Sequence, residues 1–167
     1  MALVLEDGSL VDGANSFVSV AEVRAYATAR ASDLSAFADA AIEAAAIKAA
    51  DYTKGLRDRF KGDEIVIEQA LPFPRIYLVV NGFELPSDEV PQGIKDANCQ
   101  LAIESANGTD LQVTTQGQIV TKKKVGPLET TFSDRSSESG TQLFHAASSL
   151  FAPYMSGSPG ALSSVRI

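Results

Sequence analysis

The chain is poor in the residue types that build most catalytic and metal sites. Its 167 residues include one cysteine, one histidine and no tryptophan. Cys99 alone cannot form a disulfide bond within this chain, and one thiol fits a reducing compartment. His145 has no identifiable serine or cysteine partner, and catalytic or metal sites need several positioned groups. We therefore expect a buried, inert thiol at Cys99, a partly buried helical histidine at position 145, no cofactor, no metal and no enzymatic activity.

The motifs that carry well-defined chemistry are also missing. The sequence contains no GxGxxG, Walker A, HExxH or CxxC pattern. Asp7, Asp12 and Asn15 lie close together, but they lack the alternating spacing and the closing glutamate of an EF-hand calcium loop. Such residues form turns in many loops. We interpret them as turn formers and expect no calcium site.

Long apolar runs and an excess of basic residues are absent as well. No run approaches the ~18 residues of a membrane span. The N-terminal stretch MALVLEDGSL turns acidic by residue 6 and has no basic region, which predicts no signal peptide. We expect a soluble, cytoplasmic protein. The net charge of −7 argues against a surface that seeks phosphate everywhere, because phosphate binding depends on clustered lysine and arginine.

What the sequence does contain is helical periodicity. Ser19 and Glu22 form a capping-box pattern, in which each side chain binds the other residue's backbone N–H. Apolar residues then recur at helical spacing in four segments, and Asn107-Gly108 is typical of a helix end. The predicted helices cover about residues 20–30, 38–55, 91–107 and a last segment from about Leu143 to Tyr154.

Two β-prone runs flank Gly126-Pro127 and predict a β-hairpin over residues 118–133. The C-terminal stretch is rich in glycine, serine and proline, as flexible segments are. We therefore predict a mostly α protein: a small bundle of about four helices with a projecting β-hairpin and a flexible tail. Its domains would be a single helical domain over residues 1–155, hairpin included, and a tail over residues 156–167.

The segment QALPFPRIYL, residues 69–78, stands between the second and third predicted helices. Pro72 and Pro74 each fix their own backbone and disfavour helical geometry in the preceding residue. Phe73 lies between them and Arg75 follows. We interpret residues 72–75 as an extended strut that fixes the spacing of the two helices.

Two clusters of basic residues are candidates for binding. Lys54, Arg57, Arg59 and Lys61 surround Phe60, as in a nucleic-acid site with a stacking ring. Lys122, Lys123 and Lys124 lie on the predicted hairpin, where alternation puts the middle lysine on the other face. A solvated surface or an acidic protein partner would explain either cluster equally well.

Five blocks of the sequence, in order, resemble a family of tailed-phage proteins. They are EDGSLVDGANSFVSVAEVRAY, AAIKAADYTKGLRDRFKG, QALPFPR, EVPQGIKDANCQLA and KKKVGPLETTF. Members of that family are often labelled DnaT-like ssDNA-binding proteins, and they are similar to head–tail connector, or adaptor, proteins. The resemblance covers roughly residues 4–132.

The resemblance implies a structural adaptor with no catalytic residues. It would form a cyclic homo-oligomer, a dodecamer if it copies portal symmetry, beneath the phage portal protein. A tail-side neck or tail-terminator protein would bind the other side, and genomic DNA would pass through the ring without sequence-specific binding. The protein would assemble in the host cytoplasm and reside in the neck of the virion, with no contact to a membrane.

A ring requires two different complementary faces on each subunit. We expect these faces to use the basic tip, which is the segment KGLRDRFKG (54–62), together with the hairpin and the tail. The predicted interface residues are Arg57, Arg59, Lys122, Lys123, Lys124, Val125, Leu128, Leu162, Val165 and Arg166. The alternative is a single-stranded-DNA-binding accessory protein that uses Arg57, Arg59, Phe60 and the three hairpin lysines.

Overall fold

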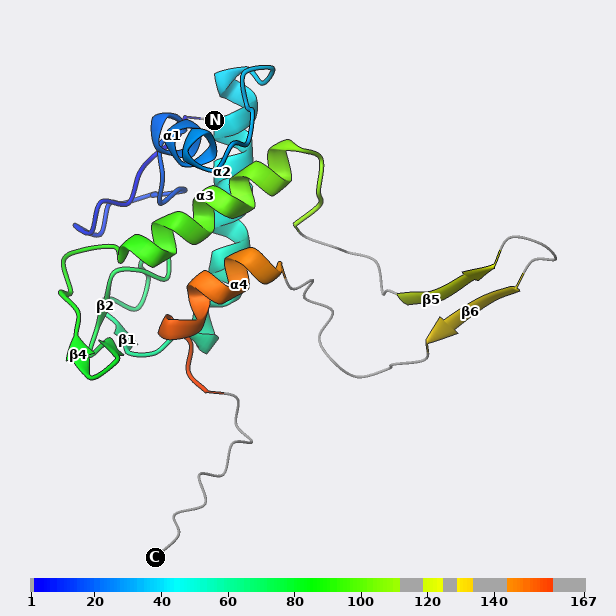
Figure 1. Cartoon of the computed structure of the whole chain (residues 1–167). Coiled ribbons are helices and arrows are strands. Elements are labelled where there is room, and N and C mark those ends of the chain that lie inside the picture. Colours follow the sequence, from blue (N-terminus) through cyan, green and yellow to red (C-terminus); the bar gives the residue numbers. More distant parts are fainter. Residues whose placement is uncertain (1, 112–118, 125–128, 134–143, 158–167) are drawn as a thin grey trace, which may run out of the picture. The chain divides into compact units, whose positions relative to one another are not determined.

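The computed structural model describes residues 2–111, 119–124, 129–133 and 144–157 (Figure 1). The chain divides into two compact units, one of residues 1–111 and 144–167 and one of residues 112–143. The helices of the described residues belong to the first unit, and the second contains a β-hairpin. The predicted fold class, mostly α with a β-hairpin, is confirmed. The single domain over residues 1–155 stays a prediction.

The four predicted helices are present and begin and end close to the predicted residues. A short 3₁₀ turn follows α2 and another follows α4; these are η1 (Arg57–Arg59) and η2 (Ala152–Tyr154). The α-helices are α1 (Val20–Ala29), α2 (Asp39–Gly55), α3 (Gln92–Ala106) and α4 (His145–Phe151).

The start of α1 has the predicted capping box. The Ser19 hydroxyl accepts from the Glu22 backbone N–H at 3.2 Å, and the Glu22 carboxylate accepts from the Ser19 N–H at 2.7 Å. Both N–H groups lack a partner inside the helix, so the two side chains satisfy the donors that the first turn leaves free.

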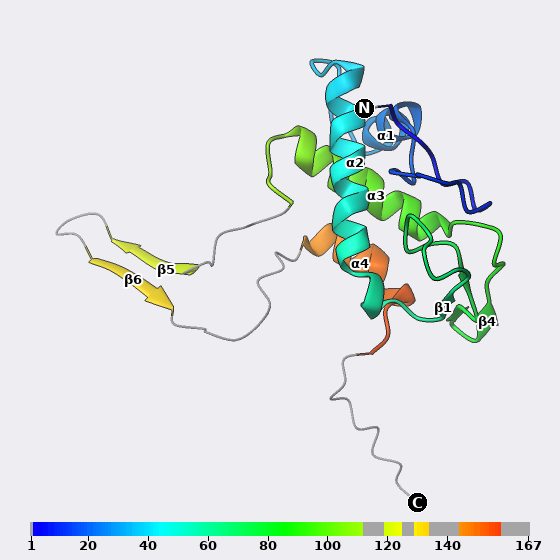
Figure 2. The same ribbon diagram turned by 180° about the vertical axis from the view of Figure 1, so that it is seen from behind.

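Helix α3 is the central element of the first unit. It packs against α1, α2 and α4, and Figures 1 and 2 show it between α1 and α4 and crossing α2. Ile94 and Leu101 are completely buried and Cys99 nearly so. An apolar surface around most of the helix predicts this central position, because each face then needs a partner.

Small residues on α2 allow close contact with α3. Ile42, Ala46 and Ala49 are fully buried along its inward stripe. The Thr53 hydroxyl lies 3.1 Å from Oδ1 of Asn98 on α3, and both side chains are fully buried. A buried polar pair of this kind must be hydrogen-bonded, so it fixes the register of the two helices as well as their contact.

Two short antiparallel hairpins lie between α2 and α3 in sequence. Strand β1 (Asp63–Glu64) pairs with β2 (Arg75–Ile76). Strand β3 (Val79–Val80) pairs with β4 (Phe83–Glu84) through a turn at Asn81-Gly82. Both turn residues have positive φ, +52° and +84°, as the favoured two-residue hairpin turn requires.

The second unit is the predicted hairpin. Strand β5 (Ile119–Lys124) pairs antiparallel with β6 (Glu129–Ser133), and the register is irregular between Val120 and Lys122. The hairpin prediction over residues 118–133 is thus confirmed in its strands. Its turn at Gly126-Pro127 lies outside the described residues, as do residues 158–167 of the tail predicted over residues 156–167.

Candidate functional site

Phe73, predicted as part of a strut, is a central core residue. It is fully buried, and its ring lies edge-on to those of Phe17, Phe60 and Tyr154 at centroid distances of 6.4, 4.8 and 6.4 Å. The chain bends on both sides of Phe73, and the Phe73–Pro74 peptide bond is cis. The segment therefore does not run straight as an extended strut would. It turns inward and places one aromatic ring where α4 and η1 meet.

Arg75 is a buried link between loops. Its guanidinium donates to the carbonyls of Lys61 at 2.9 Å, Gly62 at 2.8 Å and Pro72 at 3.2 Å. Burial lowers the pKa of Arg75, and the nearby Glu64 carboxylate opposes that effect. The planar fork of arginine suits several carbonyls at once. Arg75 thus joins the turn after η1 to the proline segment.

Arg57, a predicted interface residue, is also tied into the fold. Its guanidinium donates to Glu64 at 3.0 Å and to the Gln69 carbonyl at 2.9 Å. Glu64 lies between two arginines, since its other oxygen is 3.6 Å from Arg75. The three side chains form one partly buried cluster, so Arg57 is not a free surface cation.

The aromatic ring of the basic tip is unavailable to a base. Phe60 is 4% exposed, and its ring contacts Phe73 and, at 5.8 Å, Phe151. The Lys61 ammonium donates to the Pro153 carbonyl at 2.8 Å. Of the four cations around Phe60, Lys54 and Arg59 are the exposed ones. The basic tip consequently lacks the open stacking ring that a single-strand site needs.

The structure places His145 on α4 and Cys99 on α3, and the predictions for these two residues have different outcomes. The prediction for His145 is wrong: it is the first residue of α4 and is exposed, because the buried face of this short helix is formed by Ala147 and Phe151. Cys99 is buried as predicted, and burial raises the pKa of its thiol to about 12. Such a thiol is protonated at neutral pH and therefore a poor nucleophile.

The remaining predicted interface residues are only partly placed. Lys122, Lys123 and Lys124 form the end of β5, opposite Thr131, Thr130 and Glu129. The others lie outside the described residues: Val125, Leu128, Leu162, Val165 and Arg166. Within the part of the chain that the structure describes, no three side chains could hold a metal ion together, and no helix is long and apolar enough to cross a membrane.

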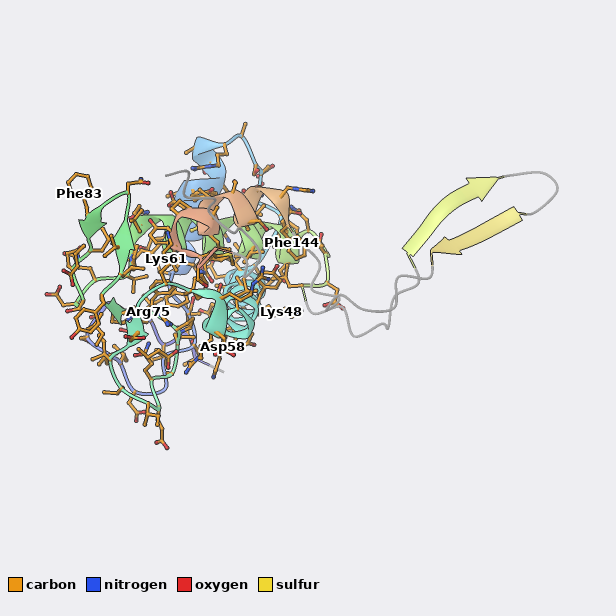
Figure 3. The ribbon with its side chains drawn as sticks, turned by 90° about the horizontal axis from the view of Figure 1, so that it is seen from below. Lys48, Asp58, Lys61, Arg75, Phe83 and Phe144 are labelled. Carbon is orange, nitrogen blue, oxygen red and sulfur yellow. The ribbon has the colours of Figure 1, made fainter. Side chains whose placement is uncertain are left out.

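Sequence reasoning missed the most exposed apolar residues near the β3–β4 hairpin. Tyr77 is 68%, Val79 46% and Phe83 74% exposed, and we name these three residues the apolar edge. Figure 3 shows Phe83 at the margin of the first unit, pointing away from the helices. The Asn81-Gly82 turn is the sequence feature that indicates this exposure. In a hairpin of two-residue strands, the side chains on both sides of the turn cannot all be buried.

Backbone contacts hold the apolar edge in place. Tyr77 has φ +56°, an uncommon value for a bulky residue. Gly62 packs directly beneath this segment: a Cβ there would lie 2.4 Å from the Ile76 carbonyl oxygen. The Leu85 N–H also donates to the Leu78 carbonyl at 2.8 Å and extends the hairpin ladder. Tyr77 is therefore presented by a constrained backbone.

A pocket of about 350 Å³ adjoins the hairpin. Leu85 and Pro86, which follow β4 directly, line it together with Asp7, Glu89 and Lys95. A hydrogen bond from the Ser9 hydroxyl lowers the pKa of Asp7, and the charge of Lys95 adds a smaller effect. Two carboxylates and one ammonium line the pocket, which is therefore mixed in character and net acidic.

The whole segment that carries the apolar edge is acidic. Residues 63–89 contain six carboxylates and a single base, the buried Arg75. Five of the six carboxylate residues are exposed, while Glu64 is half-buried between its two arginines. The six are Asp63, Glu64, Glu68, Glu84, Asp88 and Glu89.

One comparison with known proteins gives a match. The model of a protein family described as "Putative DnaT-like ssDNA binding protein" matches residues 1–167. The match spans the whole chain, so the chain belongs to this family. No curated protein and no solved structure matches.

Proposed function

We propose that this member of the DnaT-like family is a structural adaptor of a tailed phage. In this proposal it forms a ring beneath the portal protein, binds a neck or tail-terminator protein on the other side, and lets DNA pass through. The five ordered blocks that resemble adaptor proteins motivate the proposal. The protein acts by assembly, with no catalytic role.

The observation that carries the proposal is the apolar edge. Phe83 and Tyr77 expose most of their side-chain surface on a constrained backbone, in a unit whose other aromatic rings pack in the core. Aromatic residues in such positions are the ones that contribute most to protein–protein binding. A solvated aromatic gains by burial against a partner, at about 25 cal/mol per Å² of apolar area.

The contacts of the basic tip argue against a DNA site there, which favours the adaptor proposal. Arg57 is bound to Glu64 and Gln69, and Phe60 is buried under α4. A DNA site at the tip would have to break these contacts. An acidic chain is also suited to a channel through which DNA must slide, because attraction to phosphate would retard it.

The test is native mass spectrometry of the full chain mixed with the portal protein of the same phage. We expect a saturating complex with one copy per portal subunit. The variant Phe83→Ser should reduce complex formation, while the matched variant Phe73→Leu keeps an apolar core and should not. A wild-type protein that stays monomeric both alone and with the portal would overturn the adaptor proposal.

Single-stranded-DNA binding is the second candidate, and the description of the family favours it. The three consecutive lysines of β5 are its best sequence support. In this case Arg59 and the hairpin lysines would contact phosphate, without a stacking role for Phe60. The affinity should fall steeply with salt, with a slope of about −0.7 per phosphate contact on single strands.

The two candidates are separated by one triple variant. Lys122→Ala/Lys123→Ala/Lys124→Ala should flatten the salt dependence of DNA affinity if the lysines bind phosphate. A wild-type protein without measurable retention on single-stranded DNA at 50 mM salt would exclude this second function. Lys48→Ala, at an exposed position of α2 outside both basic clusters, is the control.

A further inference from the structure

The acidic segment that carries the apolar edge, residues 63–89, contains no exposed basic residue. Its one arginine is buried and bound to three carbonyls, and Lys95 is the only base that lines the adjoining pocket. The segment thus presents five exposed carboxylates together with exposed aromatic side chains. A partner for this surface must supply positive charge as well as apolar contact.

The chain itself contains one segment with that chemistry. Strand β5 reads IVTKKK, three β-branched residues followed by three lysines. The exposed surface of α2 is a weaker match, since Lys48 and Lys54 alternate with Asp51 and Asp58 follows. Figure 3 shows Lys48 and Asp58 on the same side of the first unit, so this surface carries both signs of charge.

We propose that the β5–β6 hairpin of one copy docks onto the apolar edge and its acidic surroundings, Glu84 and Asp88 above all, in the next copy. The inference rests on the adaptor function proposed above and names the two faces that a ring contact needs. Such a contact is heterologous: each copy offers its hairpin to one neighbour and its acidic edge to the other. The lysines would meet the carboxylates, and the β-branched residues would meet Tyr77 and Phe83.

Charge exchange between two variants of the full chain tests this directly. Variant one carries Lys122→Glu/Lys123→Glu/Lys124→Glu, and variant two carries Glu84→Lys/Asp88→Lys. Each alone places like charges against each other, and each should self-associate at least about ten-fold more weakly than wild type, since opposed like charges cost several kcal/mol in an interface. An equimolar mixture should recover assembly, because every hairpin then meets a surface of opposite charge.

The matched control is Asp12→Lys/Asp51→Lys, which makes the same charge change at two exposed positions outside the acidic segment, residues 63–89. It should assemble like wild type. Sedimentation velocity at 100 mM salt measures the masses. Assembly of both reversal variants at wild-type strength, or no recovery in the mixture, would overturn the docking contact while leaving the portal complex intact.

A disulfide-trapping experiment distinguishes contact between copies from contact within one chain. Val120→Cys and Phe83→Cys variants are mixed under an oxidising thiol–disulfide buffer, and Cys99 stays silent because it is buried. We expect a covalent dimer of the two variants. The pair Val120→Cys with Lys48→Cys should give far less. A chain that carries both Val120→Cys and Phe83→Cys and forms only an internal disulfide would show an intramolecular contact and would overturn the proposal, whatever the portal measurement gives.

Discussion

Two neighbouring segments of the first unit use similar residues in opposite ways. Residues 57–75 contain aromatic rings and arginines that turn inward, where Phe60, Phe73 and Arg75 fill the core or bind carbonyls. Residues 77–84 contain aromatic rings that turn outward, at Tyr77 and Phe83. The first segment joins α2 to the core, whereas the second presents a surface.

The difference lies in what each segment can bind within the chain. The first segment lies among carbonyls that need donors, and Arg75 supplies them at Lys61, Gly62 and Pro72. The second is a hairpin of two-residue strands whose ladder is already complete through Leu85. Side chains that find no internal partner remain available to a second molecule.

The strongest test of this contrast is the pair Phe73→Ala and Phe83→Ala. Phe73 is fully buried among three rings, so its loss should cost about 3–5 kcal/mol of unfolding free energy. Phe83 is 74% exposed, and its loss should cost less than about 0.5 kcal/mol. Urea denaturation followed by circular dichroism measures both. Equal effects would mean that the hairpin is part of the core.

A second pair contrasts a buried arginine, Arg75, with an exposed one, Arg59. Arg75→Ala removes the donor of three hydrogen bonds to carbonyls and the cation 3.6 Å from Glu64, which should cost about 2–4 kcal/mol. Arg75→Lys should recover only part of this, because a single ammonium cannot span the same carbonyls. Arg59→Ala, at an exposed position, should change stability by less than about 0.5 kcal/mol. A neutral Arg75→Ala would remove its role as a link between loops.

The helices could be predicted from the sequence because their signals are local. Apolar spacing, the Ser19–Glu22 capping box and the Asn107-Gly108 end depend on residues a few positions apart. The β5–β6 strands were predictable for the same reason. The one helical error, at His145, arose because a helix of two turns has a buried face too narrow to be inferred from periodicity.

The candidate surface could not be predicted, because it depends on contacts between distant residues. Arg57 and Phe60 read as a DNA-binding tip until Glu64, Gln69 and Phe151 are placed around them. Apart from the Asn81-Gly82 turn, no local pattern in the sequence marks Tyr77 and Phe83 as exposed. Only the pairing of β1 with β2 and the close packing of Gly62 show which rings have space to turn inward.

A third pair compares two glycines, one beneath the apolar edge and one at its turn. Both have positive φ, +71° at Gly62 and +84° at Gly82. A Cβ at Gly62 would meet the Ile76 carbonyl, while none of the described atoms lies within 4 Å of one at Gly82. Gly82→Ala should therefore cost about 1 kcal/mol from backbone strain alone, and Gly62→Ala about 2 kcal/mol more. Denaturation midpoints measure this, and equal costs would show that the segment shifts freely away from Gly62.

The smallest expected effect concerns DNA. Phe60→Leu keeps an apolar side chain under α4 and should leave the affinity for a fluorescein-labelled oligothymidine unchanged within about two-fold, since a buried ring stacks on no base. Loss of a stacked base would cost about 1–3 kcal/mol, a change of at least five-fold. Fluorescence anisotropy at 50 mM salt separates these outcomes, with the triple lysine-to-alanine variant of β5 as the comparison. A five-fold loss in Phe60→Leu would mean that the inward-facing segment opens to bind DNA, and the contrast between the two segments would no longer hold.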